Sequence, residues 1–168
     1  MGIFNLHGRV AVVTGGTAGL GRGMAIALAR QGADLAILAR RPDKLTETAR
    51  EIESLGGRCL PVVCDISDEA SVQNAVETLV NYYKKVDILV NNAGIIKRIP
   101  AVEMSVADFQ QVLNIDLTGP FIMSKAVAPA MIKKGAGKII NMCSMMSEVG
   151  GDTVSAYAAA KGGLKMLT

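Results

Sequence analysis

Short apolar runs alternate with longer segments of helical periodicity along the chain. Runs of Val, Ile, Leu and Ala predict buried strands, and apolar residues three or four positions apart predict helices between them. The expected strands are 9–13, 35–39, 59–64, 88–90 and 138–142. The expected helices are 20–30, 42–55, 68–85, 105–134 with an interruption at Gly119-Pro120, and a last one that contains Tyr157. This alternation predicts an α/β fold with right-handed βαβ units and a doubly wound parallel sheet covered by helices on both faces.

Composition agrees with one packed domain. The chain has 168 residues, of which half are apolar and 4% aromatic, and this length is enough for a sizeable core. Its net charge of +3 comes from scattered Lys and Arg, with no basic run longer than pairs such as Lys133-Lys134. Nucleic-acid binding therefore has little support, and no apolar stretch reaches the length of a membrane span.

The cysteines and the single histidine bear on compartment and metal binding. Three cysteines, Cys59, Cys64 and Cys143, are an odd number, and residues 1–5 (MGIFN) show no charged region followed by an apolar one. Both features predict a cytoplasmic protein with reduced thiols. With His7 alone and no cluster of Cys and His, we expect no metal site.

A glycine-rich stretch joins the first expected strand to the first expected helix. Residues 14–21 read T-G-G-T-A-G-L-G. Glycines in this position let a pyrophosphate approach the backbone N–H groups at the positive end of a helix. A turn that serves packing alone is the alternative. The predicted cofactor contacts are Gly15, Thr17, Gly19, Leu20 and Gly21.

Two arginines follow the second expected strand, in Ala39-Arg40-Arg41. A nicotinamide-binding fold often carries an acidic residue here that binds the adenine ribose, whereas a basic residue suits a 2′-phosphate. Arg40 therefore predicts a preference for NADP(H), with NAD(H) still possible. In the alternative interpretation, Arg40 only stacks on the adenine.

Other polar residues fall where the later strands end, which is where ligands of an open parallel sheet bind. Asp65 ends the third strand, N-N-A-G at 91–94 ends the fourth, and Ser144 follows the fifth. Asn114 is a polar residue in an otherwise apolar helical stripe. Each has an ordinary explanation by itself, such as a helix cap, a turn asparagine or a satisfied buried amide. Their joint placement predicts a binding cleft.

Tyr157 and Lys161 are four residues apart in an alanine-rich stretch that favours a helix. At this spacing the two side chains share a face, and a nearby ammonium lowers the pKa of a phenol. The pair is therefore a possible proton donor and the group that tunes it. Such a pair also occurs by chance on amphipathic helices.

Together these motifs resemble the classical short-chain dehydrogenase/reductase family. They are T-G-x-x-x-G-x-G at 14–21, N-N-A-G at 91–94, the helix residue Asn114, Ser144, and Y-x-x-x-K at 157–161. The resemblance covers almost the whole chain and implies a Rossmann-type fold and a nicotinamide cofactor.

A narrower resemblance concerns the last thirty residues. Residues 138–150 and 156–168 are similar to gluconate 5-dehydrogenases, which are also called 5-keto-D-gluconate 5-reductases. This implies that the chain interconverts a secondary alcohol and a ketone on a sugar acid. Arg98, just beyond N-N-A-G, would bind the carboxylate, with a solvated surface residue as the alternative.

The family resemblance also implies catalytic roles. Tyr157 would exchange the proton on the substrate oxygen, Ser144 would bind that oxygen, and Lys161 would hold the nicotinamide ribose. Asn114 would position a water that relays protons. Cys143 is expected to be a small core residue that faces away from the pocket. Further cofactor contacts would come from Asp65, Ile66, Asn91, Asn92, Ala93 and Gly94.

The chain departs from the family in length. Members normally continue with another strand, two lid helices, and a final helix and strand, whereas these 168 residues stop about three turns into the catalytic helix. We therefore expect residues 1–168 to form a single truncated dinucleotide-binding domain, with little activity unless the cleft is covered. The complete protein would be a homotetramer or homodimer.

Other functions are compatible with these motifs. The chain could be another reductase of the family, acting on a 3-oxoacyl-carrier protein or on a different sugar or polyol. It could also be an inactive fragment that binds the cofactor, or an interaction module that uses the exposed sheet edge.

Overall fold

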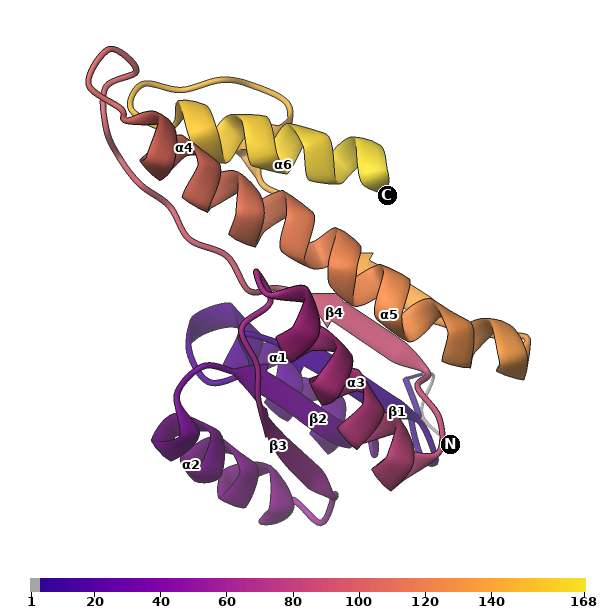
Figure 1. Ribbon diagram of the computed structural model, residues 1–168. Coiled ribbons are helices and arrows are strands. Elements are labelled where there is room, and N and C mark those ends of the chain that lie inside the picture. The colour runs from indigo at the N-terminus through magenta and orange to yellow at the C-terminus, as the bar shows by residue number, and fades with distance from the viewer. Residues whose placement is uncertain (1–3) are drawn as a thin grey trace.

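A computed structural model describes residues 4–168, so residues 1–3 of the opening stretch lie outside the described residues. Five parallel strands form one sheet in the order β3-β2-β1-β4-β5 (Figure 1). The strands are β1 (Val10–Thr14), β2 (Asp34–Ala39), β3 (Cys59–Val63), β4 (Ile88–Asn91) and β5 (Lys138–Asn141). The chain adds β2 and β3 on one side of β1, then crosses to add β4 and β5 on the other. This confirms the predicted doubly wound parallel sheet, with its topological switch point between β1 and β4.

Helices connect the strands. They are α1 (Gly19–Arg30), α2 (Pro42–Glu53), α3 (Glu69–Tyr83), α4 (Val106–Leu113), α5 (Gly119–Lys134) and α6 (Ser155–Leu167). A π-helix, η1 (Asn114–Thr118), joins α4 to α5, and a short 3-10 helix, η2 (Met145–Ser147), follows β5. Local sequence explains several of their starts. Asp68 caps α3 by accepting from the Ala70 N–H, and Ser105 caps α4 by accepting from the Asp108 N–H.

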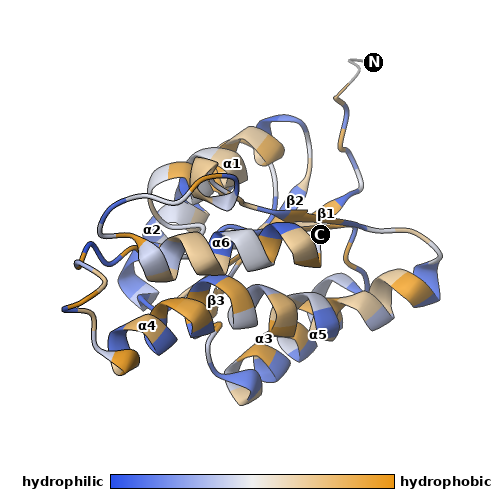
Figure 2. Cartoon of the chain, turned by 90° about the horizontal axis from the view of Figure 1, so that it is seen from above, coloured by the Kyte–Doolittle hydropathy of each residue, from blue (hydrophilic) through white to orange (hydrophobic). Residues whose placement is uncertain are grey.

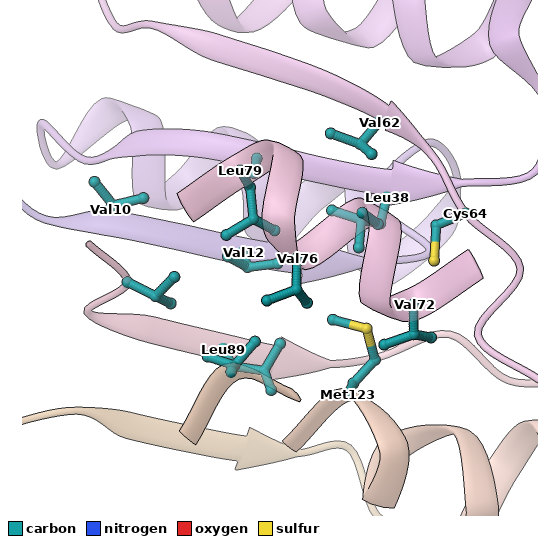
Figure 3. Packing of buried hydrophobic residues seen from close by; sticks show 14 of the residues in the cluster. Val10, Val12, Leu38, Val62, Cys64, Val72, Val76, Leu79, Leu89 and Met123 are labelled. Carbon is teal, nitrogen blue, oxygen red and sulfur yellow. The ribbon is translucent and has the colours of Figure 1, made fainter. Parts of the chain in front are cut away.

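The core divides into two layers, one on each face of the sheet. Because side chains alternate along a strand, Val10 and Val12 pack with α3 and α5, as Figure 3 shows for that cluster. Ala11 and Val13 point the other way, into a cluster formed with α1 and α2. Both faces of the inner strands are therefore buried, which explains their unbroken apolar runs.

The long helical region differs from the prediction at its centre. An interruption was expected at Gly119-Pro120, but the helix continues through both residues. The irregular segment lies one turn earlier, at η1, where the Gly119 N–H donates to the Asn114 carbonyl, five residues back. Pro120 has no N–H to donate, and the wider turn before it absorbs the missing bond without a break.

Helix α6 lies beside α4 in both views of the chain (Figures 1 and 2). Their contact is apolar and fully buried at Val112 of α4 and at Ala156 and Ala160 of α6. Figure 2 shows that both helices mix hydrophilic and hydrophobic residues, as expected of helices with one buried face. Within residues 4–168, no helix has the length and hydropathy to cross a membrane.

Candidate active site

A cavity of about 480 Å³ opens at the carboxyl ends of the central strands. This volume lies within the range of small-molecule sites, and the position is the switch point of the sheet. Of the predicted cofactor residues, Gly19, Asn91, Tyr157 and Lys161 do not line this cavity. Its walls are Gly15, Thr17, Ala18, Leu20, Gly21, Leu38, Ala39, Arg40, Arg41, Cys64, Asp65, Ile66, Asn92, Ala93, Gly94, Ile95 and Ile115.

The glycine-rich loop fits closely against the end of β4. Gly15 has a φ of +65°, and a Cβ on it would lie 3.0 Å from both the Ala93 Cα and the Asn92 Nδ2. A Cβ on Gly21 would lie 2.3 Å from the Gly15 oxygen, so that position needs glycine. The N-cap of α1, Ala18, makes no side-chain hydrogen bond, and the first turn holds no acidic residue. The positive end of α1 is therefore available to an anionic ligand.

Thr14 joins the ends of β1 and β4 next to the cavity through hydrogen bonds. The sequence did not reveal this role. The buried Thr14 hydroxyl accepts from the N–H groups of Asn92 at 3.0 Å and Ala93 at 3.1 Å. The Asn92 side chain donates back to the Thr14 carbonyl at 3.0 Å. These bonds fix the ends of β1 and β4 relative to each other.

Asn91 does not line the cleft as predicted. Its buried side chain donates to Ser124 Oγ at 3.0 Å and to Asn141 Oδ1 at 2.9 Å, which ties β4 to α5 and β5. Asn91 is the last residue of β4 and faces α5 and β5, whereas Asn92 follows the strand and lines the cavity. The prediction for Asn91 was wrong, and Asn92 takes that place.

Arg40 and Asp65 form the charged side of the cavity. The hydroxyl of Ser67, its N–H and the more distant Arg40 guanidinium together hold the pKa of Asp65 below its usual range. Ser67 Oγ donates to Asp65 Oδ1 at 2.7 Å. Arg40 is exposed and has no ion pair within 4.0 Å among the described residues. Its guanidinium is therefore available to an added anion.

Three of the predicted catalytic residues come from the start of η2 and from α6, which pack against each other. Ser144 caps η2 by accepting from the Met146 N–H at 3.2 Å. Tyr157 and Lys161 are both on α6, with Lys161 Nζ 5.6 Å from the centroid of the Tyr157 ring. Lys161 is buried and donates to the Met142 carbonyl at 2.9 Å. The phenol thus has a fixed cation next to its ring.

The structure brings Asp116, and not Asn114, to Lys161. Asn114 Oδ1 accepts from Gln110 at 2.8 Å, and Asn114 lines a neighbouring hollow of about 330 Å³ together with Arg40 and Asp65. Asp116 is fully buried, with its Oδ2 3.4 Å from Lys161 Nζ.

The signal for Asp116 was present in the sequence. Asn114 and Asp116 are two residues apart on a helix, so their side chains point in different directions. Asp116 also stands between two apolar residues, Ile115 and Leu117. An acidic residue in such surroundings is buried only where a partner offsets its charge.

Arg98 lies on an exposed loop that is tied to the segment between Ser144 and Tyr157. The next residue, Ile99, donates its N–H to the Thr153 carbonyl at 2.9 Å. Lys97 is held in an ion pair with Asp108 at 2.5 Å. The backbone therefore places Arg98 next to the segment that carries the predicted catalytic residues.

The cysteines separate into two environments. Cys59 and Cys64 are buried and free, and burial raises the pKa of Cys59 to about 12. Cys143 is exposed, so the prediction of a small core residue was wrong. The reason is that β5 is the edge of the five-stranded sheet, where Ile139 and Ile140 are also exposed. No group of three possible metal ligands occurs among residues 4–168.

Comparison with known proteins identifies the family. Residues 9–168 match the family model for short chain dehydrogenases. The chain belongs to this family.

Two curated relatives and one solved structure illustrate the match. The chain is 48% identical to the 2-dehydro-3-deoxy-D-gluconate 5-dehydrogenase of Formosa agariphila, over 99% of the chain and 63% of the relative. It is 36% identical to the gluconate 5-dehydrogenase of Gluconobacter oxydans, over 99% of the chain and 65% of the relative. A candidate NAD(P)-dependent gluconate 5-dehydrogenase from Beutenbergia cavernae, with NADP bound at low occupancy, superposes with a TM-score of 0.94 at 42% identity. That match covers 99% of this chain and 66% of the other.

The chain spans less than two thirds of the length of these relatives. The resemblance to the short-chain dehydrogenase family, drawn from the motifs, is confirmed, and so is the likeness to gluconate 5-dehydrogenases within it.

Proposed function

We propose that this short-chain dehydrogenase is an NADP(H)-dependent oxidoreductase that interconverts gluconate and 5-ketogluconate. The observation that carries the proposal is the buried Lys161 beside the Tyr157 ring, on a helix packed against the turn that Ser144 caps. Two hydroxyl groups and a cation in this arrangement suit proton exchange with a substrate oxygen.

The cavity fits a dinucleotide. Gly15 and Gly21 leave no space for a side chain, the positive end of α1 is uncapped, and Asp65 lines the same cavity. We infer that the glycine-rich loop holds the pyrophosphate, Asp65 the adenine, and Arg40 the 2′-phosphate. When bound, the nicotinamide accepts or donates the hydride.

The catalytic side chains then divide the chemistry among them. In ketone reduction, Tyr157 donates its phenolic proton to the substrate oxygen, and in alcohol oxidation it takes that proton back. Ser144 donates a hydrogen bond to the same oxygen as negative charge develops on it. Lys161 orients the ribose and acts on the phenol through its charge.

The substrate proposal rests on chemistry that the two curated relatives share. Both names describe oxidation at C5 of a gluconate-type sugar acid. Such a substrate carries a carboxylate several carbons from the reacting carbon, and Arg98 is an exposed cation beside the catalytic segment. A guanidinium binds a carboxylate through two parallel hydrogen bonds.

The test uses the full natural protein and compares substrates in the presence of NADPH. We expect turnover with 5-ketogluconate and much less with a 3-oxoacyl thioester or an uncharged ketose. In Arg98→Ala, the KM for 5-ketogluconate should rise by about tenfold or more, the value of one charge-assisted bond, while the KM for an uncharged ketose stays unchanged.

Lys133→Ala is the matched control, because Lys133 is an exposed cation on α5, outside the loop that carries Arg98. Equal effects of Arg98→Ala on both substrates would remove Arg98 from the site. Preference for the thioester would replace the sugar acid as the substrate.

A further inference from the structure

Asp116 is a buried charge that the mechanism above does not use. It lies on η1 with no exposed surface, and its Oδ1 accepts from the Ile95 N–H at 2.7 Å. Its Oδ2 has no hydrogen-bond partner among the described residues. Burial of a carboxylate costs several kcal/mol unless a nearby charge offsets it. The position therefore needs a partner.

Lys161 is that partner. The 3.4 Å between Asp116 Oδ2 and Lys161 Nζ is short enough for strong attraction, although the hydrogen bond of the ammonium goes to the Met142 carbonyl instead. Both side chains are buried, so water and salt screen their attraction much less than that of a surface pair. Burial raises the pKa of Asp116, while the Ile95 N–H and Lys161 favour its ionised form.

The wall of the cofactor cleft is shaped around this carboxylate. A Cβ on Gly94 would lie 2.7 Å from Asp116 Oδ2, so a side chain at position 94 would displace one of the two. Gly94 lines the cleft itself. The carboxylate thus lies directly behind the cleft wall on one side and faces Lys161 on another.

We propose that Asp116 is a positioning residue that offsets part of the charge of Lys161 and so moderates the effect of that ammonium on the Tyr157 phenol. An isolated ammonium next to a phenol favours the phenolate. An ammonium paired with a carboxylate acts as a dipole, and its effect on the phenol is much weaker. This inference rests on the proposed function for the role of Tyr157.

Other charged groups on or next to the elements packed against α6 lie nearer the surface, and two of them, Glu103 and Asp152, are exposed without an ion pair among the described residues. On α4, Asp108 pairs with Lys97, and just after η2, Glu148 pairs with Lys165 of α6 itself. The buried charges among these elements are Asp116 and Lys161. Lys161 is the buried cation beside the Tyr157 ring, and Asp116 is the buried charge that faces this cation.

The test is a spectroscopic titration of Tyr157 in the cofactor-free protein. Phenolate absorbance is followed as the pH rises, and the curve of a Tyr157→Phe variant is subtracted to remove Tyr82 and Tyr83. Asp116→Asn keeps the size of the side chain and an oxygen for the Ile95 N–H, but removes the charge. We expect the Tyr157 pKa to fall by about one unit in Asp116→Asn, as for an added neighbouring charge.

Two further variants keep the test decisive. Asp116→Ser also removes the charge and retains an acceptor, so it replaces Asp116→Asn if that variant does not fold. Glu69→Gln removes one negative charge from an exposed pair with Lys125 and should leave the titration unchanged.

The outcomes separate this inference from the proposed function. The pH profile of alcohol oxidation should shift in the same acidic direction as the absorbance titration. A Tyr157 pKa that stays the same or rises in the uncharged variants would overturn the role of Asp116. Because the absorbance measurement needs no turnover, it remains valid if no sugar acid is a substrate.

Discussion

Two buried aspartates lie before and after β4, and their surroundings differ. Asp87, just before the strand, accepts from the Val10 N–H at 2.9 Å and forms ion pairs with three basic side chains, those of Arg9, Lys85 and Lys134. Asp116 accepts from the Ile95 N–H beyond the strand, and among the described residues it has one neighbouring cation and one oxygen without a hydrogen bond. The first carboxylate is saturated with partners, and the second is not.

The two pKa values move in opposite directions as a result. Burial alone would raise the pKa of Asp87, but Lys134, the Val10 N–H and Arg9 outweigh it and hold that pKa below the usual value. At Asp116 burial prevails and raises the pKa. The comparison shows that the ion pairs of Asp87 at the amino end of the sheet stabilise the fold. At the carboxyl end, where the chemistry is proposed to occur, the pair of Asp116 and Lys161 has fewer stabilising partners.

The largest expected effect is the loss of stability when Asp87, at the amino end of the sheet, is replaced. Asp87→Ala should lower the free energy of unfolding by about 2–3 kcal/mol, because it removes a buried acceptor and the common partner of three cations. Urea denaturation followed by circular dichroism measures this. Glu47→Ala, which breaks an exposed ion pair with Lys44, is the control and should change little. Equal losses in both variants would mean that the buried ion pairs of Asp87 stabilise the protein no more than an exposed pair does.

The second prediction concerns ligand choice at the carboxyl end of the sheet. Ala39 provides no carboxylate for ribose hydroxyls, and a charge-assisted contact from Arg40 to a 2′-phosphate is worth about 1.5–3 kcal/mol. We expect about a ten- to hundredfold preference for NADP(H) over NAD(H) in fluorescence titrations. The preference should vanish or invert in the Ala39→Asp, Arg40→Ala double variant, with no loss of stability. An unchanged ratio of the affinities for NADP(H) and NAD(H) would show that these two positions do not recognise the 2′-phosphate.

The smallest effect is on the pH dependence of stability. A lowered pKa at Asp87 gives stability that is present above the ordinary carboxyl pKa and is lost as the pH falls through the lowered value. A raised pKa at Asp116 acts in the opposite sense, because ionising the buried group costs stability as the pH rises. Asp87→Asn should therefore flatten the rise of stability on leaving acidic pH, and Asp116→Asn should steepen it. Parallel curves for the parent and both variants would refute the comparison.

The fold was largely predictable from sequence. Strands buried on both faces read as continuous apolar runs, and Pro42 and Asp68 marked helix starts correctly. The π-helix was not predictable in this way, because Gly119-Pro120 gives a local signal for a break. Tertiary packing keeps the helix continuous there and moves the irregular turn to Asn114–Thr118.

The residues of the site were predictable where a sequence motif fixes the course of the backbone. They were less predictable where the direction of a single side chain determines its partner. The glycine-rich loop and residues 92–94 line the cavity as expected. Asn91 does not line the cavity, because its side chain faces α5 and β5, and the water-positioning role of Asn114 stays a prediction. Asp116 was missed because its partner, Lys161, is 45 positions away in the sequence.

The most direct test of the proposed chemistry is turnover by Tyr157→Phe. The variant keeps the ring and removes the transferable proton, so kcat for 5-ketogluconate reduction should fall by at least about a hundredfold. The affinity for NADPH should stay that of the parent, since the cavity residues are untouched. Near-parent turnover in Tyr157→Phe would contradict the account, because the proton would then come from another group.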